Sequence, residues 1–176
     1  MEQQLIIFCG PDKTGKTEIA HELSSRLGIP TFKACDEKSK FRNEKNFINE
    51  MRYADPRMLD LLSQTGYSLI LDRAYPCEWV YSQFFHRETD LSAVRNSDRH
   101  FASLGTKIIV CFRSDYSGLY DEDRPDLLTE ENLNKLSKLY FEFGKWTQCD
   151  IYYLNVDSED LEQEIDEITA FLKGKK

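Results

Sequence analysis

LIIFCGPDKTGKT, residues 5–17, is the stretch that decides the fold of this chain. Its first part, Leu5 to Cys9, is an apolar run that predicts a buried β-strand. The rest, Gly10 to Thr17, fits the pattern G-x-x-x-x-G-K-[ST] in full. The glycines of this pattern allow turns that point several backbone N–H groups toward an anion at the N-terminus of the next helix. The stretch therefore predicts a phosphate-binding loop, and the alternative is a glycine-rich turn that exposes a lysine.

The side chains of this loop predict which phosphate compound it binds. Lys16 would supply a positive charge to β- and γ-phosphates, and Thr17 would offer its hydroxyl to a magnesium ion. We therefore expect a nucleoside triphosphate, ATP, together with Mg²⁺ as the cofactors. The residues expected to contact ATP are Gly10, Pro11, Asp12, Lys13, Thr14, Gly15, Lys16 and Thr17.

The remainder of the chain alternates short apolar runs with longer helical patterns. Further strands are predicted at residues 30–33, 67–71, 107–112 and 151–156, and the last helix at residues 158–172. This alternation predicts one α/β domain over residues 1–176, with a parallel sheet of about five strands and helices on both faces. With the loop, it predicts a three-layer P-loop NTPase fold. In such a sheet, ligands bind beyond the carboxyl ends of the strands.

Composition and charge argue against several classes of protein. The 176 residues carry a formal net charge of −8, whereas a generic nucleic-acid binder needs a cationic surface. No two of the five cysteines form a CxxC pair, so neither a zinc site nor a redox motif is predicted. No apolar stretch approaches membrane-spanning length, and no basic leader precedes the first strand. We therefore expect a cytoplasmic protein with reduced thiols and no contact with a membrane.

A second predicted strand also ends in charged residues. Asp72 follows the apolar run at residues 68–71, and Arg73 comes next. In P-loop proteins such an aspartate usually reaches the magnesium shell, and a guanidinium suits a second phosphate or carboxylate. The alternative is an Asp–Arg pair that only closes a strand. Because the chain has no Asn-Lys-x-Asp guanine motif, a kinase with an acceptor substrate is favoured over a hydrolytic GTPase.

Together these motifs resemble the thymidylate kinase family of P-loop nucleoside monophosphate kinases. The loop is similar to the family's variant G-x-D-x-x-G-K-[ST], with Asp12 at its third position. Asp72 and Arg73, followed by Tyr81, resemble the family's D-R-x(7)-[YF] segment. The resemblance covers roughly residues 1–85 plus the last strand and helix.

A third segment adds to this resemblance. Arg52 and Tyr53 lie on a predicted helix ahead of the stretch Leu61 to Gly66, which leads into the Asp-Arg strand. This order and spacing are similar to the family's helix–glycine–strand block. Residues 86–128, in contrast, match the family poorly.

The resemblance implies a role for each matching residue. Asp12 would contact the 3′-hydroxyl of the acceptor sugar, and Lys13 the transferring phosphoryl group. Arg73 would hold the acceptor's monophosphate, and Tyr81 would pack against its base or sugar. Arg52 would reach the pyrimidine edge or the acceptor phosphate.

Some of these roles have plainer alternatives. Lys33 ends the predicted second strand, where relatives often place an arginine for the acceptor phosphate, but its neighbours lack the usual Arg-x-Pro pattern. Arg52 could lie on a solvated helix face, and Tyr81 could pack in the core with neighbouring aromatic residues.

Residues 113–128 correspond to the lid that family members close over the donor phosphates, commonly with an arginine. Arg124 is the candidate for this arginine, and Arg113 is a second candidate near the donor base. Acidic residues flank Arg124, so a solvated acidic loop is the alternative. A short, acidic lid would suit an unusual acceptor such as a modified deoxynucleotide. The implied catalytic residues are Asp12, Lys13, Lys16, Arg73 and Arg124.

The activity implied by the resemblance is ATP-dependent phosphoryl transfer to a deoxynucleoside monophosphate. A pyrimidine is preferred, either dTMP-like or a modified dUMP or dCMP. A phosphate acceptor needs no strong base, because its oxygen is ionised near neutrality.

Other functions stay open. A nucleoside hydroxyl would need a carboxylate base, and Asp36 and Glu37 follow the second predicted strand, so a deoxynucleoside kinase is an alternative. A kinase of polynucleotide ends or modified bases, or a nucleotide-binding regulator without catalysis, are two more. The implied partner is a small nucleotide and, because the resembling family often dimerises, a second copy of the chain.

Overall fold

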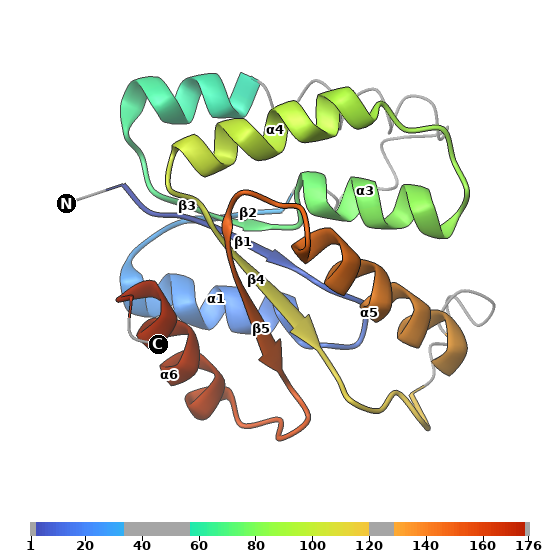
Figure 1. Ribbon diagram of the computed structural model, residues 1–176. Helices are drawn as coiled ribbons and strands as arrows, with labels where there is room; N and C mark the ends of the chain where they lie inside the picture. Colours follow the sequence, from blue (N-terminus) through green and yellow to red (C-terminus); the bar gives the residue numbers. More distant parts are fainter. Residues whose placement is uncertain (1–2, 34–56, 120–128, 175–176) are drawn as a thin grey trace.

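The computed structural model describes residues 3–33, 57–119 and 129–174, and these form a three-layer α/β domain around a parallel sheet (Figure 1). The sheet has five strands in the order β2-β3-β1-β4-β5. All four strand pairings are parallel. The strands are β1 (Leu5–Cys9), β2 (Thr31–Phe32), β3 (Leu69–Asp72), β4 (Lys107–Phe112) and β5 (Asp150–Asn155). The predicted fold class is therefore confirmed.

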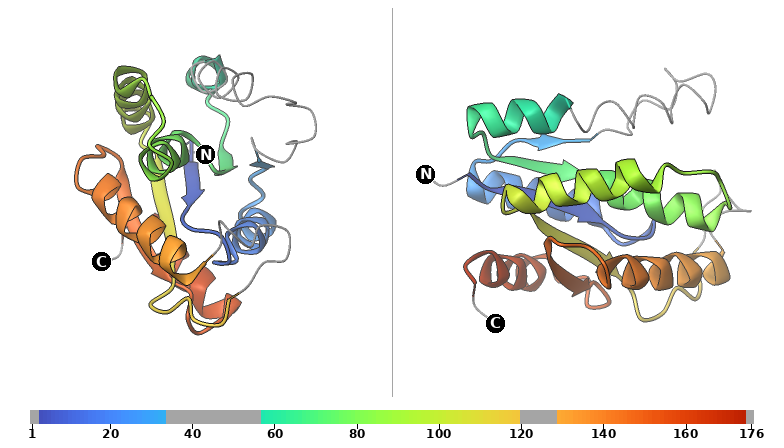
Figure 2. Two further views of the ribbon diagram at one scale, coloured as in Figure 1. Left: turned by 90° about the vertical axis from the view of Figure 1, so that its right-hand side faces the viewer. Right: turned by 45° about the horizontal axis from the view of Figure 1, so that its top comes forward.

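Helices cover both faces of this sheet. They are α1 (Lys16–Leu27), α3 (Tyr75–Phe84), α4 (Leu91–Ser103), α5 (Glu130–Gly144) and α6 (Leu161–Leu172). Residues 57–65 are also helical. Figures 1 and 2 show α1 and α6 side by side on one face, with α3, α4 and α5 on the other. None of the helices described is long and apolar enough to cross a membrane.

Each face of the sheet has its own hydrophobic core, because successive side chains of a strand point to opposite sides. On β1, Ile7 and Cys9 belong to the core under α3, α4 and α5. Ile6 and Phe8 belong to the core under α1 and α6. All five β1 residues are buried, so the strand that leads into the glycine-rich loop is held from both sides.

The register of the sheet brings the predicted site segments to one edge. Phe8 of β1 pairs with Asp72 of β3, and the N–H of Arg73 donates to the Phe8 carbonyl oxygen at 2.9 Å. The glycine-rich loop and the Asp72-Arg73 pair therefore leave the sheet next to each other, at the carboxyl ends of β1 and β3. This is the edge at which open α/β sheets bind their ligands.

Several predicted strand ends were wrong by one or two residues, and the start of the last helix was wrong by three. The last helix begins at Leu161, not at residue 158. Asp160 caps it by accepting a hydrogen bond from the N–H of Gln163, and Glu159 has a left-handed backbone with φ of 53°. The residues before Asp160 form the turn that follows β5, and this turn contributes to the site described next.

Candidate functional site: a glycine-rich loop beside an arginine cluster

The loop at residues 10–15 takes a shape that its glycines make accessible. Gly10 has a φ of 134°, and a side chain there would collide with the carbonyl oxygen of Cys111 on β4. Gly15 has a φ of 65° and is the N-cap of α1. Lys13, although it is not a glycine, is also left-handed, with a φ of 63°. The loop thus leaves β1 in close contact with the main chain of β4 and ends at the N-terminus of α1, the positive end of its helix dipole.

Lys16 lies inside this loop. Its Nζ donates to the carbonyl oxygen of Pro11 and, at 3.0 Å, to Oγ1 of Thr14. The side chain is nearly inaccessible, with 5% of the residue exposed. Burial lowers the pKa of Lys16, and the nearby positive charge of Arg73 lowers the pKa further. An anion in the loop would offset both effects, so the loop and its lysine are suited to phosphate.

Asp72 and Thr17 meet at the mouth of the loop. The Thr17 hydroxyl donates to Oδ2 of Asp72 at 2.7 Å, and Nζ of Lys33 lies 3.8 Å from the same oxygen. Asp72 is 1% exposed, and its Oδ1 has no hydrogen-bond partner among the described residues. A buried carboxylate oxygen without a partner, next to a hydroxyl, fits a hard cation with oxygen ligands such as Mg²⁺.

Arg73, Asp12 and Tyr81 form a second group beside the loop. Arg73 Nη2 makes a salt bridge with Asp12 Oδ1. The Tyr81 hydroxyl donates to Asp12 Oδ2 at 3.3 Å and accepts from Arg73 Nη1 at 3.4 Å. Arg73 has a φ of 75°, which turns the chain sharply from β3 into α3. This cluster joins the loop, β3 and α3 into one unit.

Tyr81 combines packing with a polar contact. Its ring stacks on Phe85, with ring centroids 6.2 Å apart, and the Arg73 guanidinium lies 5.9 Å from the Tyr81 ring centroid. Burial raises the pKa of its hydroxyl, so the group stays protonated near neutrality. The Tyr81 ring therefore packs against a neighbouring aromatic residue, as the alternative expected, while its hydroxyl contacts the other residues of the candidate site.

Arg113 follows β4 and reaches the loop from the other side. Its Nε donates to the Lys13 carbonyl oxygen at 2.9 Å, and its Nη2 pairs with Glu159 at 2.8 Å. Sequence reasoning did not single out Glu159. Its position just after the last strand, at the same sheet edge as the loop, is the signal that could have found it.

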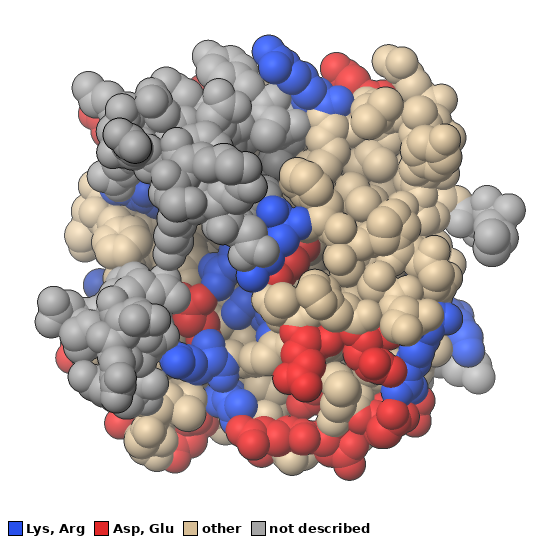
Figure 3. Space-filling model, turned by 180° about the vertical axis from the view of Figure 1, so that it is seen from behind, with Lys and Arg blue, Asp and Glu red and all other residues tan. Residues whose placement is uncertain are grey.

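The distribution of charged side chains on the side of the molecule seen in Figure 3 agrees with an anion site. In Figure 3, Lys and Arg side chains gather in a hollow near the middle of the view with a few Asp and Glu side chains beside them, and further Asp and Glu side chains form a band beneath. The protein is acidic overall, with a net charge of −8, so these basic side chains are a local exception. A local cationic pocket is sufficient for a small anionic ligand.

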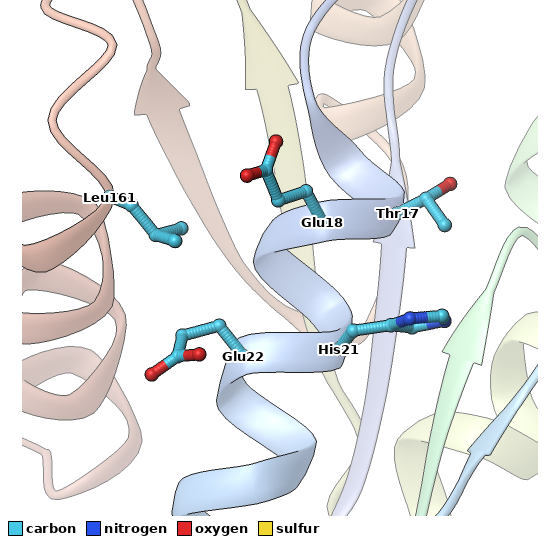
Figure 4. A pocket seen from close by; sticks show the side chains of 5 residues that line it. All are labelled: Thr17, Glu18, His21, Glu22 and Leu161. Carbon is cyan, nitrogen blue, oxygen red and sulfur yellow. The ribbon is translucent and has the colours of Figure 1, made fainter.

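A groove along α1 borders the anion site and shares Thr17 with it. It measures about 580 Å³ and is lined by Thr17, Glu18, His21, Glu22 and Leu161. Figure 4 shows Glu18 and Glu22 on the side of α1 that faces Leu161, with Thr17 and His21 on the other side. Two carboxylates would repel a phosphate, so we do not expect the nucleotide to bind in this groove.

The structure therefore brings together most of the predicted site residues, within the loop or in contact with it. Those brought together are Asp12, Lys13, Lys16, Thr17, Lys33, Asp72, Arg73, Tyr81 and Arg113. Arg52, Arg124, Asp36 and Glu37 lie outside the described residues. Lys33 contacts Asp72, which places it on the side of the proposed cation.

Comparison with known proteins gives a clear result for structures only. No protein-family model matches the chain, and no curated protein sequence does. Among solved structures, a thymidylate kinase from Ehrlichia chaffeensis aligns with a TM-score of 0.68 at 14% identity, covering 98% of this chain and 100% of that one. The YorR protein of Bacillus subtilis, in complex with phosphorylated GDP, aligns with a TM-score of 0.66 at 17% identity, covering 96% of this chain and 95% of that one.

Deoxyadenosine kinase from M. mycoides with bound dATP is similar to a comparable degree. Its TM-score is 0.63 at 19% identity, with 96% of this chain and 99% of that chain covered. These similarities span nearly the whole of both chains, although the sequences have diverged widely. The chain therefore has the P-loop kinase fold shared by thymidylate and deoxyadenosine kinases, and the resemblance predicted from its motifs is confirmed at the level of the fold.

Proposed function

We propose that this protein transfers a phosphoryl group from ATP to a deoxynucleoside monophosphate, with a pyrimidine preferred. The observation that carries the proposal is the contact between Asp12 of the loop and Arg73. Through it, a cationic loop for one phosphate compound and an arginine for another share one site. Two anionic substrates bound there would meet end to end.

On the donor side, the loop would bind the β- and γ-phosphates of ATP. Its inward N–H groups and the α1 N-terminus supply partial positive charge, and Lys16 supplies a full one. Lys16 would exchange its bonds to Pro11 and Thr14 for phosphate oxygens. Lys13 would contact the phosphoryl group as it moves.

Thr17 and Asp72 are the residues that would hold Mg²⁺. When bound, the ion supplies positive charge to the donor phosphates as negative charge shifts during transfer. Asp72 has an oxygen in reserve for this purpose, because its Oδ1 has no hydrogen-bond partner among the described residues. Lys33, close to Oδ2, would add a further charge beside the phosphates.

On the acceptor side, Arg73 would hold the monophosphate and Asp12 the 3′-hydroxyl of the sugar. Tyr81 would pack against the sugar or base. An oxygen of the acceptor phosphate attacks the γ-phosphorus of ATP, and the bond from this phosphorus to the β–γ bridging oxygen breaks, which releases ADP. The acceptor oxygen is already ionised, so no carboxylate base is needed. Arg52 would contact the acceptor, and Arg124 would contact the donor phosphates.

The neighbouring structures support this class of activity. The Ehrlichia chaffeensis neighbour is a thymidylate kinase, and YorR was crystallised with phosphorylated GDP. The proposal of a homodimer rests only on the resemblance to the thymidylate kinase family.

The proposal is tested by following ADP release with the purified protein, ATP and Mg²⁺ across a panel of acceptors. The panel contains the four deoxynucleoside monophosphates, modified dUMP and dCMP, and the matching nucleosides. Turnover of at least one pyrimidine monophosphate is the expected result. Turnover of nucleosides but of no monophosphate would contradict the proposal.

A deoxynucleoside kinase is the second candidate, because deoxyadenosine kinase is among the neighbours at 19–22% identity. In that case Asp36 or Glu37 would act as the base for the acceptor hydroxyl. Replacing both by Asn and Gln would then abolish turnover of a nucleoside. Under the first proposal, the same variant keeps its activity on a monophosphate.

A further inference from the structure

The carbonyl group of Lys13 is fixed by a residue far away in sequence. Lys13 has a left-handed backbone with φ of 63°, which is strained for a residue with a side chain. Its carbonyl oxygen accepts a hydrogen bond from Arg113 Nε at 2.9 Å. Since the orientation of this carbonyl depends on the backbone angles of Lys13, the bond favours the left-handed state.

Arg113 is itself anchored by neighbouring elements. Its Nη2 pairs with Glu159 at 2.8 Å, and its main-chain N–H donates to the hydroxyl of Tyr116 at 3.1 Å. Tyr116 is fully buried and hydrogen-bonded to Ser137 of α5 at 2.8 Å. The guanidinium therefore approaches the loop from a rigid base.

The strand ends on both sides of Arg113 are also joined to each other. The N–H of Val156 donates to the Phe112 carbonyl oxygen at 3.0 Å, and the N–H of Ser114 donates to the Asp157 carboxylate at 3.0 Å. These bonds hold the end of β4 against the turn after β5. The main-chain segments that carry Arg113 and Glu159 are thus held together by hydrogen bonds beside the loop.

We propose that Arg113 is a positioning residue for the phosphate-binding loop. It holds Lys13 in the left-handed state, so that the N–H groups of the loop converge and the Lys13 side chain is carried toward the phosphates. This inference rests on the proposed function, because it assumes that the loop binds donor phosphates. It differs from the sequence-based expectation that Arg113 lies near the donor base, since its described side-chain contacts are to protein oxygens.

The two roles make different predictions for a ligand without a base. Inorganic tripolyphosphate would fill the loop but offers neither base nor sugar. If Arg113 acts through the loop, Arg113→Ala raises the Kd of tripolyphosphate and the Kd of ADP by the same factor. If Arg113 contacts the donor base or sugar, only ADP is affected.

The experiment measures the Kd of ADP and of tripolyphosphate by titration calorimetry, with thermal unfolding as a check on folding. For Arg113→Ala we expect both Kd values to rise about tenfold, as for loss of a charge-assisted hydrogen bond. Arg113→Lys should recover part of the loss, because a lysine can reach one oxygen but not bridge two. Glu159→Gln should cost less, about threefold, because the bond to Lys13 is retained.

Arg26→Ala is the matched control. Like Arg113, Arg26 makes an ion pair with a glutamate, here Glu162 of α6, but it has no described contact with the loop. Its Kd values should equal those of the unmodified protein. In steady-state kinetics, Arg113→Ala should show a raised KM for ATP and an unchanged KM for the acceptor.

The outcomes separate this inference from the proposed function. Unchanged Kd values in Arg113→Ala, or a loss for ADP alone, would overturn the positioning role and leave the kinase proposal intact. If the unmodified protein binds neither ADP nor tripolyphosphate, both proposals fail.

Discussion

The two halves of the proposed site, one for the phosphate donor and one for the acceptor, are built in different ways. The donor half is mainly backbone: Gly10 and Gly15 take positive φ angles, and the loop is wedged against the main chain of β4. The acceptor half is made of side chains, with Arg73 held by Asp12 and Tyr81. A backbone cradle is preformed and binds any phosphate chain, whereas a side-chain cluster can be rearranged by its ligand. We therefore expect changes in the donor half to affect every reaction, and changes in the acceptor half to depend on the acceptor.

Lys16→Ala should have the largest effect on activity. It removes the ammonium group that lies inside the loop on the Pro11 carbonyl oxygen, and removal of one preorganised charge or donor typically lowers kcat by about 10²–10³-fold. The loss should be similar for every acceptor that the protein uses. A variant that keeps more than a third of its kcat, measured by ADP release, would break the assignment of the donor half.

Gly10→Ala tests whether the backbone cradle depends on its glycine. The added Cβ would collide with the Cys111 carbonyl oxygen, at a φ of 134° that side chains rarely adopt. We expect a loss of about 3 kcal/mol in the free energy of unfolding, measured with urea.

Gly28→Ala is the control for this variant. Gly28 also has a positive φ, of 66°, but a Cβ there would meet nothing within 4 Å. It should cost only about 1 kcal/mol. Equal losses at both positions would mean that contact with β4 does not shape the loop.

Arg73→Ala tests the acceptor half. Loss of a bidentate phosphate contact should raise the KM for the monophosphate about 10–100-fold, while the Kd of ADP stays within about twofold. The selectivity of this change, rather than its size, sharpens the comparison. An equal loss for ADP and for the acceptor would show that the two halves are not separate.

Tyr81→Phe should have the smallest effect. The bonds that its hydroxyl makes to Asp12 and Arg73, at 3.3 and 3.4 Å, are long and therefore weak. We expect the KM of the acceptor to rise about threefold or less, with the stacking on Phe85 retained. A large change in kcat with no change in KM would point to a different role for the hydroxyl.

The fold and the position of the glycine-rich loop between β1 and α1 could be predicted from the sequence because both have local signals. An apolar run, two glycines and a lysine at fixed spacing determine a strand, a turn and a helix start. A parallel sheet also brings the carboxyl ends of its strands to one edge, and the observed pairing of Phe8 with Asp72 agrees with this expectation.

The interactions between side chains distant in sequence could not be predicted in the same way. Nothing in the sequence indicates that Arg113 turns toward Lys13, because that depends on the hydrogen bonds joining the ends of β4 and β5. The sequence predicts a helix from residue 158, but residues 158–160 belong to the turn between β5 and α6. Because Asp160 is the N-cap of α6, Glu159 lies outside the helix, where it pairs with Arg113.

The central claim is that two anionic ligands meet between Lys16 and Arg73. A bisubstrate compound, with adenosine and a pyrimidine deoxynucleoside joined through a chain of phosphates, tests it most directly. The account predicts that the protein binds this compound more tightly than ATP or the monophosphate alone. It also predicts that Lys16→Ala and Arg73→Ala each weaken the binding. If the compound binds no better than ATP, and Arg73→Ala leaves its Kd unchanged, the two sites are not joined and the account is contradicted.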